Sequence, residues 1–280
     1  MQPSTRLREL LGGGQTLVMP DAYDALSARI IEQLGFEAVQ CSGFSMALAA
    51  CEASEAAFGL ERNLAATRSI CGAVAVPVMA DGEDGFGDET AISSTIRRFI
   101  EAGVAGINLE DQVLGQPGPK RLIPLEQAVA KLQAARQAAE QAGAADLIIN
   151  ARTDALAAAE TETEGLAEAV NRANAYLQAG GDLVFVVGVG TLDQVKLLVR
   201  EINGPVSIAA GMPNNLDNFS IAQLRDCGVA RGSLPALLIF SAIQAMQQTL
   251  TIVREDDGFE RIIADRLTCD MAAVQALLQG

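Results

Sequence analysis

Short apolar runs alternate with longer amphipathic segments along most of this chain. The apolar runs predict eight strands, at 16–21, 38–43, 76–81, 106–111, 147–152, 183–188, 206–211 and 230–234. The amphipathic segments predict helices between them, at 25–35, 61–72, 89–103, 125–143, 162–180, 192–204 and 221–228. Strands that alternate with helices form parallel sheets, and eight strands are enough to close a barrel. The pattern therefore predicts an α/β fold, a (β/α)₈ barrel of the TIM type.

No linker or low-complexity tract interrupts this pattern. We therefore expect a single barrel domain over 1–280, with the barrel at about 15–255 and extra C-terminal helices at about 256–280. The longest apolar run, at 234–246, is broken by Ser241 and Gln244, and it predicts a buried helix that continues to about residue 254 rather than a membrane span. Two further short helices are expected after it, through Gln279.

Net charge and cysteine content limit the partners that this protein can be expected to bind and the compartment in which it can be expected to work. A net charge of −15 argues against nucleic acid and anionic membrane surfaces as partners, because the protein's field repels both. The five cysteines include no CxxC pair, which predicts a reducing compartment and neither a disulfide framework nor a zinc site. The first ten residues show no secretion signal, so we expect a cytoplasmic protein.

Acidic residues and one arginine lie at or just after the ends of three of the predicted strands. Asp81, Glu83 and Asp84 follow the third strand, Glu110 and Asp111 end the fourth, and Arg152 and Asp154 follow the fifth. The carboxyl ends of barrel strands meet at one mouth, so these side chains should converge there. Several carboxylates that face one arginine suggest a hard cation together with an anionic substrate. The chain has no histidine, so catalysis cannot use an imidazole as acid, base or metal ligand.

Several of these residues can also have structural roles, or lie in solvent, without taking part in binding or catalysis. Asp81 and Glu83 can cap the helix that follows them, and Ser42 with Gly43 can form an ordinary turn at a strand end. Arg152 can be a solvated surface charge. Tyr23, just past the first strand, either donates to an oxyanion at the mouth or packs under its loop.

Five ordered segments resemble the isocitrate lyase / phosphoenolpyruvate mutase superfamily over roughly residues 15–255. They are SGF at 42–44, ADGEDGFG at 80–87, NLEDQ at 108–112, Lys120–Arg121 and NARTDA at 150–155. The resemblance implies a modified (β/α)₈ barrel whose last helix packs on a partner subunit, in a homo-oligomer that is a tetramer or a dimer. It also implies Mg²⁺ and a small anionic 2-oxo or 2-hydroxy acid at the strand ends.

The same resemblance assigns roles to individual residues. Asp81 would bind the metal ion, with Glu83 and Glu110 contacting it through bound waters. Substrate binding falls to Ser42, to the backbone amides of Gly43 and Phe44, and to Arg152, whose guanidinium suits a carboxylate. Lys120, Arg152 and Tyr23 are the candidate catalytic residues.

The chain also departs from the superfamily's pattern. The C–C lyase branches carry a KRCGH-type loop whose cysteine is the acid, whereas the loop here, at 113–124, has Lys120 and Arg121 but neither cysteine nor histidine. Val187 stands where several lyases have a glutamate, and Ser54 and Glu55 are the nearest candidates for an aspartate expected after the SGF segment.

These features together predict a Mg²⁺-dependent lyase. It would act on a small 2-oxo or 2-hydroxy dicarboxylic acid through an enolate, by C–C cleavage or by oxaloacetate-type decarboxylation. One alternative is a protein that binds a 2-oxo acid without turning it over, an inactive paralogue. Another is a mutase or hydrolase of the phosphonopyruvate or phosphoenolpyruvate type.

Overall fold

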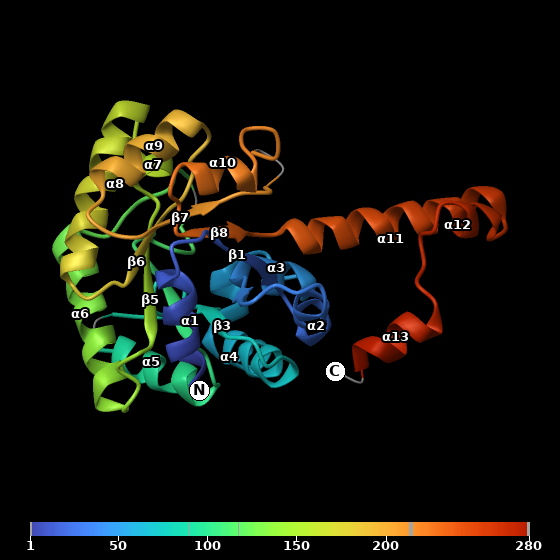
Figure 1. Ribbon diagram of the computed structural model, residues 1–280, viewed down its shortest axis with the longest axis horizontal. Helices are drawn as coiled ribbons and strands as arrows, with labels where there is room; N and C mark the ends of the chain where they lie inside the picture. Colours follow the sequence, from blue (N-terminus) through green and yellow to red (C-terminus); the bar gives the residue numbers. More distant parts are fainter. Residues whose placement is uncertain (1, 89, 117, 213–214, 279–280) are drawn as a thin grey trace.

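A closed barrel of eight parallel strands forms the centre of the computed structural model, which describes residues 2–88, 90–116, 118–212 and 215–278 (Figure 1). The strands follow one another around the barrel in chain order, and β8 pairs with β1 to close it. They are β1 Leu17–Ala22, β2 Val39–Cys41, β3 Val78–Asp81, β4 Gly106–Glu110, β5 Ile148–Thr153, β6 Leu183–Val186, β7 Val206–Ala209 and β8 Arg231–Leu234. Each overlaps one predicted strand, so the predicted barrel is confirmed.

Helices surround the barrel on its outer face. They are α1 Pro3–Gly12, α2 Ala25–Gln33, α3 Gly43–Ala49, α4 Glu55–Ala73, α5 Ile92–Glu101, α6 Leu125–Gln141, α7 Ala155–Ala158, α8 Glu162–Gln178, α9 Leu192–Glu201 and α10 Ile221–Asp226. Seven of them overlap the predicted helices, whereas α1, α3 and α7 were not predicted. Glu89, the first residue of one predicted helix, lies outside the described residues.

One predicted helix starts six residues too late, because the sequence pattern missed a kink. The structure begins α4 at Glu55, where the Ser54 hydroxyl caps it by accepting from the Ala57 amide at 3.2 Å. Gly59 then has φ 73° inside the helix, a left-handed conformation that glycine adopts without a steric penalty. The amphipathic period is therefore regular only beyond this kink, from about residue 61.

Helix α1 covers the amino-terminal end of the barrel. Its Leu7 is fully buried in a cluster with residues at or next to strand starts, namely Leu17, Met19, Ala38, Met79, Ala105, Ile148 and Leu183. This plug keeps water out of the end of the barrel opposite the mouth, because without it these side chains would be exposed.

A polar network fills the barrel interior between β1, β2, β7 and β8. Arg231 is fully buried and donates to the Ser207 hydroxyl at 2.8 Å and to the Gln40 side-chain oxygen at 2.6 Å. The Ser233 hydroxyl lies 3.3 Å from Arg231 Nη2 and donates to Asp21 at 3.0 Å. The sequence analysis did not predict this network, because its members come from strands far apart along the chain.

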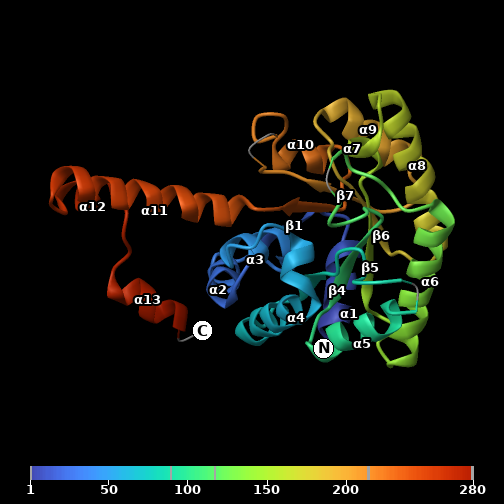
Figure 2. The ribbon, with the colours of Figure 1, turned by 180° about the vertical axis from the view of Figure 1, so that it is seen from behind.

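The C-terminal helices form an arm that extends away from the barrel (Figures 1 and 2). Helix α11, Leu237–Asp256, leads outward to α12, Glu260–Ala264, and α13, Met271–Leu278, turns back toward α2. The helix predicted at 234–254 begins later, because β8 continues to Leu234 and Ala236 takes a left-handed φ of 56° at the turn. Gln279, at the end of the last predicted helix, lies outside the described residues.

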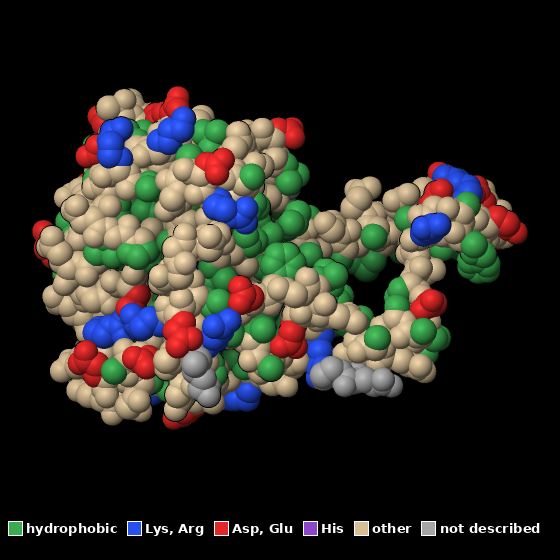
Figure 3. All heavy atoms as spheres, in the orientation of Figure 1, with side chains coloured by type: hydrophobic (Ala, Val, Ile, Leu, Met, Phe, Trp, Pro, Cys, Tyr) green, Lys and Arg blue, Asp and Glu red, His purple; other side chains and the backbone are tan. Residues whose placement is uncertain are grey.

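The expectation that this apolar helix is buried is wrong for the single chain. Ile239 and Ile252 are the buried residues of α11, whereas Met246 and Leu250 are exposed. Phe259 and Ile263 are exposed farther along the arm, and Figure 3 shows hydrophobic side chains along it beside charged ones. The predicted packing of this helix on a partner subunit stays a prediction. Across the described ranges, none of the helices has the length and apolar character that crossing a membrane requires.

Replacing Leu7 by Ala should lower the free energy of unfolding by about 2–5 kcal/mol, the usual cost of a cavity left by a buried leucine. Denaturant titration measures it, with Glu9→Ala, a partly exposed position on the same helix, as the control. A loss below about 0.5 kcal/mol, the range for surface positions, would show that α1 does not seal the barrel.

Candidate active site

Three carboxylates meet at the mouth of the barrel. Asp81 ends β3 and Glu110 ends β4, while Glu83 lies on the loop after β3 and is joined to β4 by the Glu110 amide, which donates to its carbonyl at 2.9 Å. All three are at least nine-tenths buried. One side-chain oxygen of each, Asp81 Oδ1, Glu83 Oε1 and Glu110 Oε1, is buried with no hydrogen-bond partner in the protein. Buried oxygens of this kind require a cation, a proton or water.

Gly43 lets the backbone approach these carboxylates. Its amide donates to Asp81 Oδ2 at 2.9 Å, and a Cβ built at this position would lie 1.7 Å from Glu83 Oε1. Ser42 is the N-cap of α3, where its hydroxyl accepts from the Ser45 amide at 3.2 Å. A side chain at position 43 would therefore displace the Glu83 carboxylate.

Arg152 provides the positive charge beside the cluster. It lies on β5 in register with Glu110, and its Nη1 is 2.6 Å from Glu110 Oε2. Its Nε donates to Asp154 Oδ2 at 2.8 Å, and the other oxygen of Asp154 pairs with Lys120. Asp154 thereby ties the loop at 113–122 to the strand ends. A solvated role for Arg152 is excluded by these contacts.

The carboxyls at the mouth fall into two groups, because burial raises the pKa of three of them whereas nearby cations lower the pKa of Asp154. Burial raises the pKa of Glu110 to about 8, against the attraction of Arg152, and it raises the pKa of Asp81 as well. Burial also raises the pKa of Glu83 well above its usual range, and repulsion from Asp81 and Glu110 adds to this effect. Burial opposes ionisation of Asp154 too, but Arg152 and Lys120 together outweigh it and lower its pKa.

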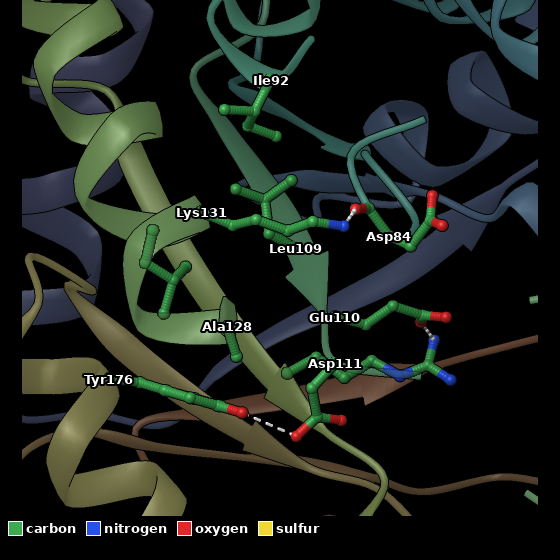
Figure 4. Close-up of a pocket in the computed structure, with 10 residues that line it drawn as sticks. Asp84, Ile92, Leu109, Glu110, Asp111, Ala128, Lys131 and Tyr176 are labelled. Carbon is green, nitrogen blue, oxygen red and sulfur yellow. Dashed lines mark hydrogen bonds and ion pairs between the residues drawn. The ribbon is translucent and has the colours of Figure 1, made fainter. Parts of the chain in front are cut away.

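A second layer of contacts fixes the strand ends from behind, and the sequence analysis missed it. The Tyr176 hydroxyl donates to Asp111 Oδ2 at 2.7 Å, and Lys131 donates to the Asp84 carbonyl at 2.8 Å (Figure 4). Arg172 also pairs with Asp111, while the other Asp111 oxygen accepts from the Asp154 amide at 3.0 Å. The cavity drawn in Figure 4, about 10 Å³, leaves room for about one water between these side chains.

A cavity of about 280 Å³ opens in front of Arg152. Ser42, Phe44, Glu55 and Lys120 line it on one side, while the chain after β6, β7 and β8 lines the other. Phe44 is held by an edge-to-face contact with Phe240 of α11, with ring centroids 6.0 Å apart. The structure thus places Ser42, Phe44, Lys120 and Arg152, all predicted binding or catalytic residues, around one small space.

Two predicted roles are not supported by this arrangement. Tyr23 packs against the hydrophobic cluster of α2, β2 and α4 and is not among the described residues that line the cavity. The Gly43 amide is used by Asp81, so it does not face a substrate. The capping alternative for Asp81 and Glu83 also fails, because Asp88 accepts from the Thr90 and Ala91 amides at the start of α5.

Comparison with known protein families shows which family this chain belongs to. The family model for phosphoenolpyruvate phosphomutase matches residues 7–254. The chain belongs to this family. The expected membership of the phosphoenolpyruvate mutase / isocitrate lyase superfamily is therefore confirmed.

Relatives within the superfamily differ in the reactions they catalyse. The chain is 32% identical to 2,3-dimethylmalate lyase of Eubacterium barkeri, over 92% of this chain and 88% of that protein. It is 30% identical to an oxaloacetate decarboxylase of Bradyrhizobium sp., over 89% of this chain and 84% of the relative. Phosphonopyruvate hydrolase, solved with oxalate and Mg²⁺, has the same fold, with a TM-score of 0.86 at 24% identity over 100% of this chain and 95% of its own.

Replacing Gly43 by Ala should displace the Glu83 carboxylate and lower the free energy of unfolding by about 1–3 kcal/mol, the usual cost of an overpacked site. Denaturant titration measures the effect. Gly72→Ala is the matched control, since a Cβ there meets nothing within 4 Å. An equal change in both variants would contradict the role given to Gly43.

The metal-free protein should lose stability as the pH rises from about 5 to about 8. Burial raises the pKa of Glu110 and of Asp21 to about 8, so in this range the folded chain holds protons that the unfolded chain has released. Melting temperatures in EDTA measure the effect, and Asp21→Asn should reduce the slope. A melting temperature that rises over this range in EDTA would contradict the prediction.

Proposed function

We propose that this chain is a Mg²⁺-dependent lyase that acts on a small 2-oxo or 2-hydroxy acid through an enolate. Dicarboxylic acids, cleaved at a C–C bond or decarboxylated as oxaloacetate is, are the first substrates to test. The observation that carries the proposal is the group of buried, unpartnered carboxylate oxygens on Asp81, Glu83 and Glu110 next to Arg152. Membership of a superfamily that includes lyases and decarboxylases supports it.

The donor set fits a magnesium ion. Mg²⁺ binds oxygen ligands, keeps several of its waters and needs only one or two carboxylates. Among the side chains that the structure describes, no group of three or more His, Cys, Asp or Glu residues can hold a metal ion directly. In the proposal Asp81 is the one direct ligand, and Glu83 and Glu110 contact the ion through water. Bound there, the cation would stabilise negative charge that develops on the 2-oxo oxygen.

Arg152 orients the substrate in this proposal. Its guanidinium lines the cavity while it pairs with Glu110 and Asp154 below, so its position is fixed before the substrate arrives. A preorganised cation of this kind stabilises developing negative charge without having to reorganise. Ser42 lines the same side of the cavity. Its hydroxyl donates to Ser45 Oγ at 3.0 Å in this structure and would turn to a substrate oxygen when the acid binds.

Lys120 is the proposed proton donor to the enolate carbon. It lines the cavity and is held by Asp154, and its loop is closed by a bridge between Gln112 and Leu122. A lysine held over the cavity in this way favours an enzyme over a binding protein, because a lid that excludes water is useful mainly to chemistry. In decarboxylation, CO₂ leaves with the loss of the bond to carbon 3, the electron pair of that bond stays on the enolate, and the Lys120 ammonium then protonates carbon 3. In C–C cleavage of a 2-hydroxy acid, the hydroxyl oxygen also becomes a carbonyl oxygen, and its proton passes to water.

Pyruvate formation from oxaloacetate and from 2,3-dimethylmalate, with Mg²⁺ or with EDTA, tests the proposal. We expect turnover in the presence of Mg²⁺ and none in EDTA. Lys120→Ala should reduce kcat by roughly 10²-fold or more, the usual contribution of a general acid, while oxalate binding changes little. Arg121→Ala, an exposed cation next in the chain, is the matched control.

Two outcomes would contradict this assignment. Undiminished kcat in Lys120→Ala would remove that residue from the mechanism. Mg²⁺-dependent oxalate binding without turnover of any acid would favour the 2-oxo-acid-binding alternative, and turnover of phosphonopyruvate alone would favour the mutase or hydrolase alternative.

A further inference from the structure

The two sides of the mouth cavity differ in chemistry. The side built by β2, β5 and the segments next to them carries the polar residues Ser42, Glu55, Lys120 and Arg152, together with the ring of Phe44. The opposite side comes from the ends of β6, β7 and β8, and we call it the apolar wall. Its members are Phe185, Val187, Val189, Ala209, Met212 and Pro235.

The polar groups near the apolar wall are already used. Asn215 is buried beside it, and its side-chain oxygen accepts from the Met212 amide at 2.9 Å. Its side-chain nitrogen donates to the Ala209 carbonyl at 3.1 Å. Asn215 therefore serves to fix the loop after β7. Within the described ranges, no charged side chain lines this half of the cavity.

The cations of the cavity lie on the opposite side and are paired with protein carboxylates. Arg152 contacts Glu110 at 2.6 Å and Asp154 at 2.8 Å, and Lys120 pairs with Asp154. Phe185 is the β6 residue in register with Arg152, so the apolar wall begins one strand beyond that guanidinium. A carboxylate placed against the wall would lose its hydration and gain no cation, which is unfavourable. An alkyl group in the same place gains by leaving water.

We propose that the apolar wall determines specificity by receiving an uncharged alkyl substituent on carbon 3 of the bound acid. The preferred substrate is then a 2-oxo or 2-hydroxy dicarboxylic acid whose carbon 3 carries, besides its own carboxylate, an alkyl substituent rather than a second charged one. The inference rests on the proposed function, because an acid whose carboxylate pairs with Arg152 would have its carbon 3 toward the wall.

Binding of three 2-oxo acids that differ by one methylene at a time tests the proposal. Pyruvate, 2-oxobutanoate and 2-oxopentanoate are titrated into the protein with saturating Mg²⁺, and 2-oxoglutarate is the carboxylate-ended counterpart of the last. We expect Kd to fall about fourfold per methylene, the factor that corresponds to ~0.8 kcal/mol for a buried CH₂. We expect 2-oxoglutarate to bind no more tightly than pyruvate.

Variants of Val187 locate the effect. Val187→Thr keeps the side-chain volume and adds a hydroxyl, so the ratio of the pyruvate Kd to the 2-oxopentanoate Kd should fall toward one. Val187→Lys adds a cation to the wall and should reverse the preference in favour of 2-oxoglutarate. Val199→Thr, on α9 and outside the described cavity lining, is the matched control and should leave the ratio unchanged.

The possible failures are distinguishable. If oxalate binds with Mg²⁺ but 2-oxoglutarate binds as tightly as 2-oxopentanoate, the specificity proposal is overturned and the proposed function stands. If the alkyl series shows its increments but Val187→Thr keeps them, the wall is not their source and the proposal is also overturned. If neither oxalate nor any oxo acid binds with Mg²⁺, the proposed function fails and this inference fails with it.

Discussion

The contacts that Arg152 makes with Glu110 and Asp154 hold the mouth of this barrel together. Arg152 and Asp154 are largely buried, so each of these two charges is unfavourable without the other, and Glu110 joins them as a charged partner only when it is ionised. The group also extends outward, because Asp154 binds Lys120 on one side and its amide donates to Asp111 on the other. Lys120, the end of β5 and, by way of Asp111, Tyr176 of helix α8 are therefore linked by the contacts of Asp154. Removing one partner from such a group leaves an uncompensated buried charge, which typically costs about 3–5 kcal/mol.

Asp154 has more cationic partners than Glu110, and this difference explains why a metal ion would bind near Glu110. Asp154 has two cationic partners, which overcome its burial and lower its pKa. Glu110 shares Arg152 with Asp154, and burial raises its pKa to about 8. In the metal-free protein, Glu110 and its neighbours Asp81 and Glu83 are thus the carboxyls that gain protons. A divalent cation in their place would supply the missing positive charge, and it would be bound more tightly as those protons leave with rising pH.

The sequence predicted the strands well, because hydrophobic period and strand length are local properties. It also predicted that Asp81, Glu83, Glu110 and Arg152 converge, since barrel topology alone brings strand ends together. It did not predict contacts between distant helices and the strand ends, such as Tyr176 with Asp111 across 65 positions. Tyr23 was predicted to face the mouth and does not, because its place after β1 does not determine the direction in which its ring points. Helix α11 was expected to be buried on composition, whereas a turn at Ala236 directs it away from the barrel.

The interior network around Arg231 explains why the apolar wall has no cation of its own. Arg231 stands at the start of β8, below the wall, and its guanidinium is directed inward. There it donates to Gln40 and Ser207 and lies close to Asp21, whose charge raises the arginine's pKa although burial lowers it overall, to about 10. A guanidinium with no exposed surface, whose hydrogen bonds are made within the barrel, cannot reach a ligand at the mouth. The β6 to β8 side of the barrel thus keeps its positive charge deep inside and presents carbon atoms to the cavity, while β3 to β5 present the charges.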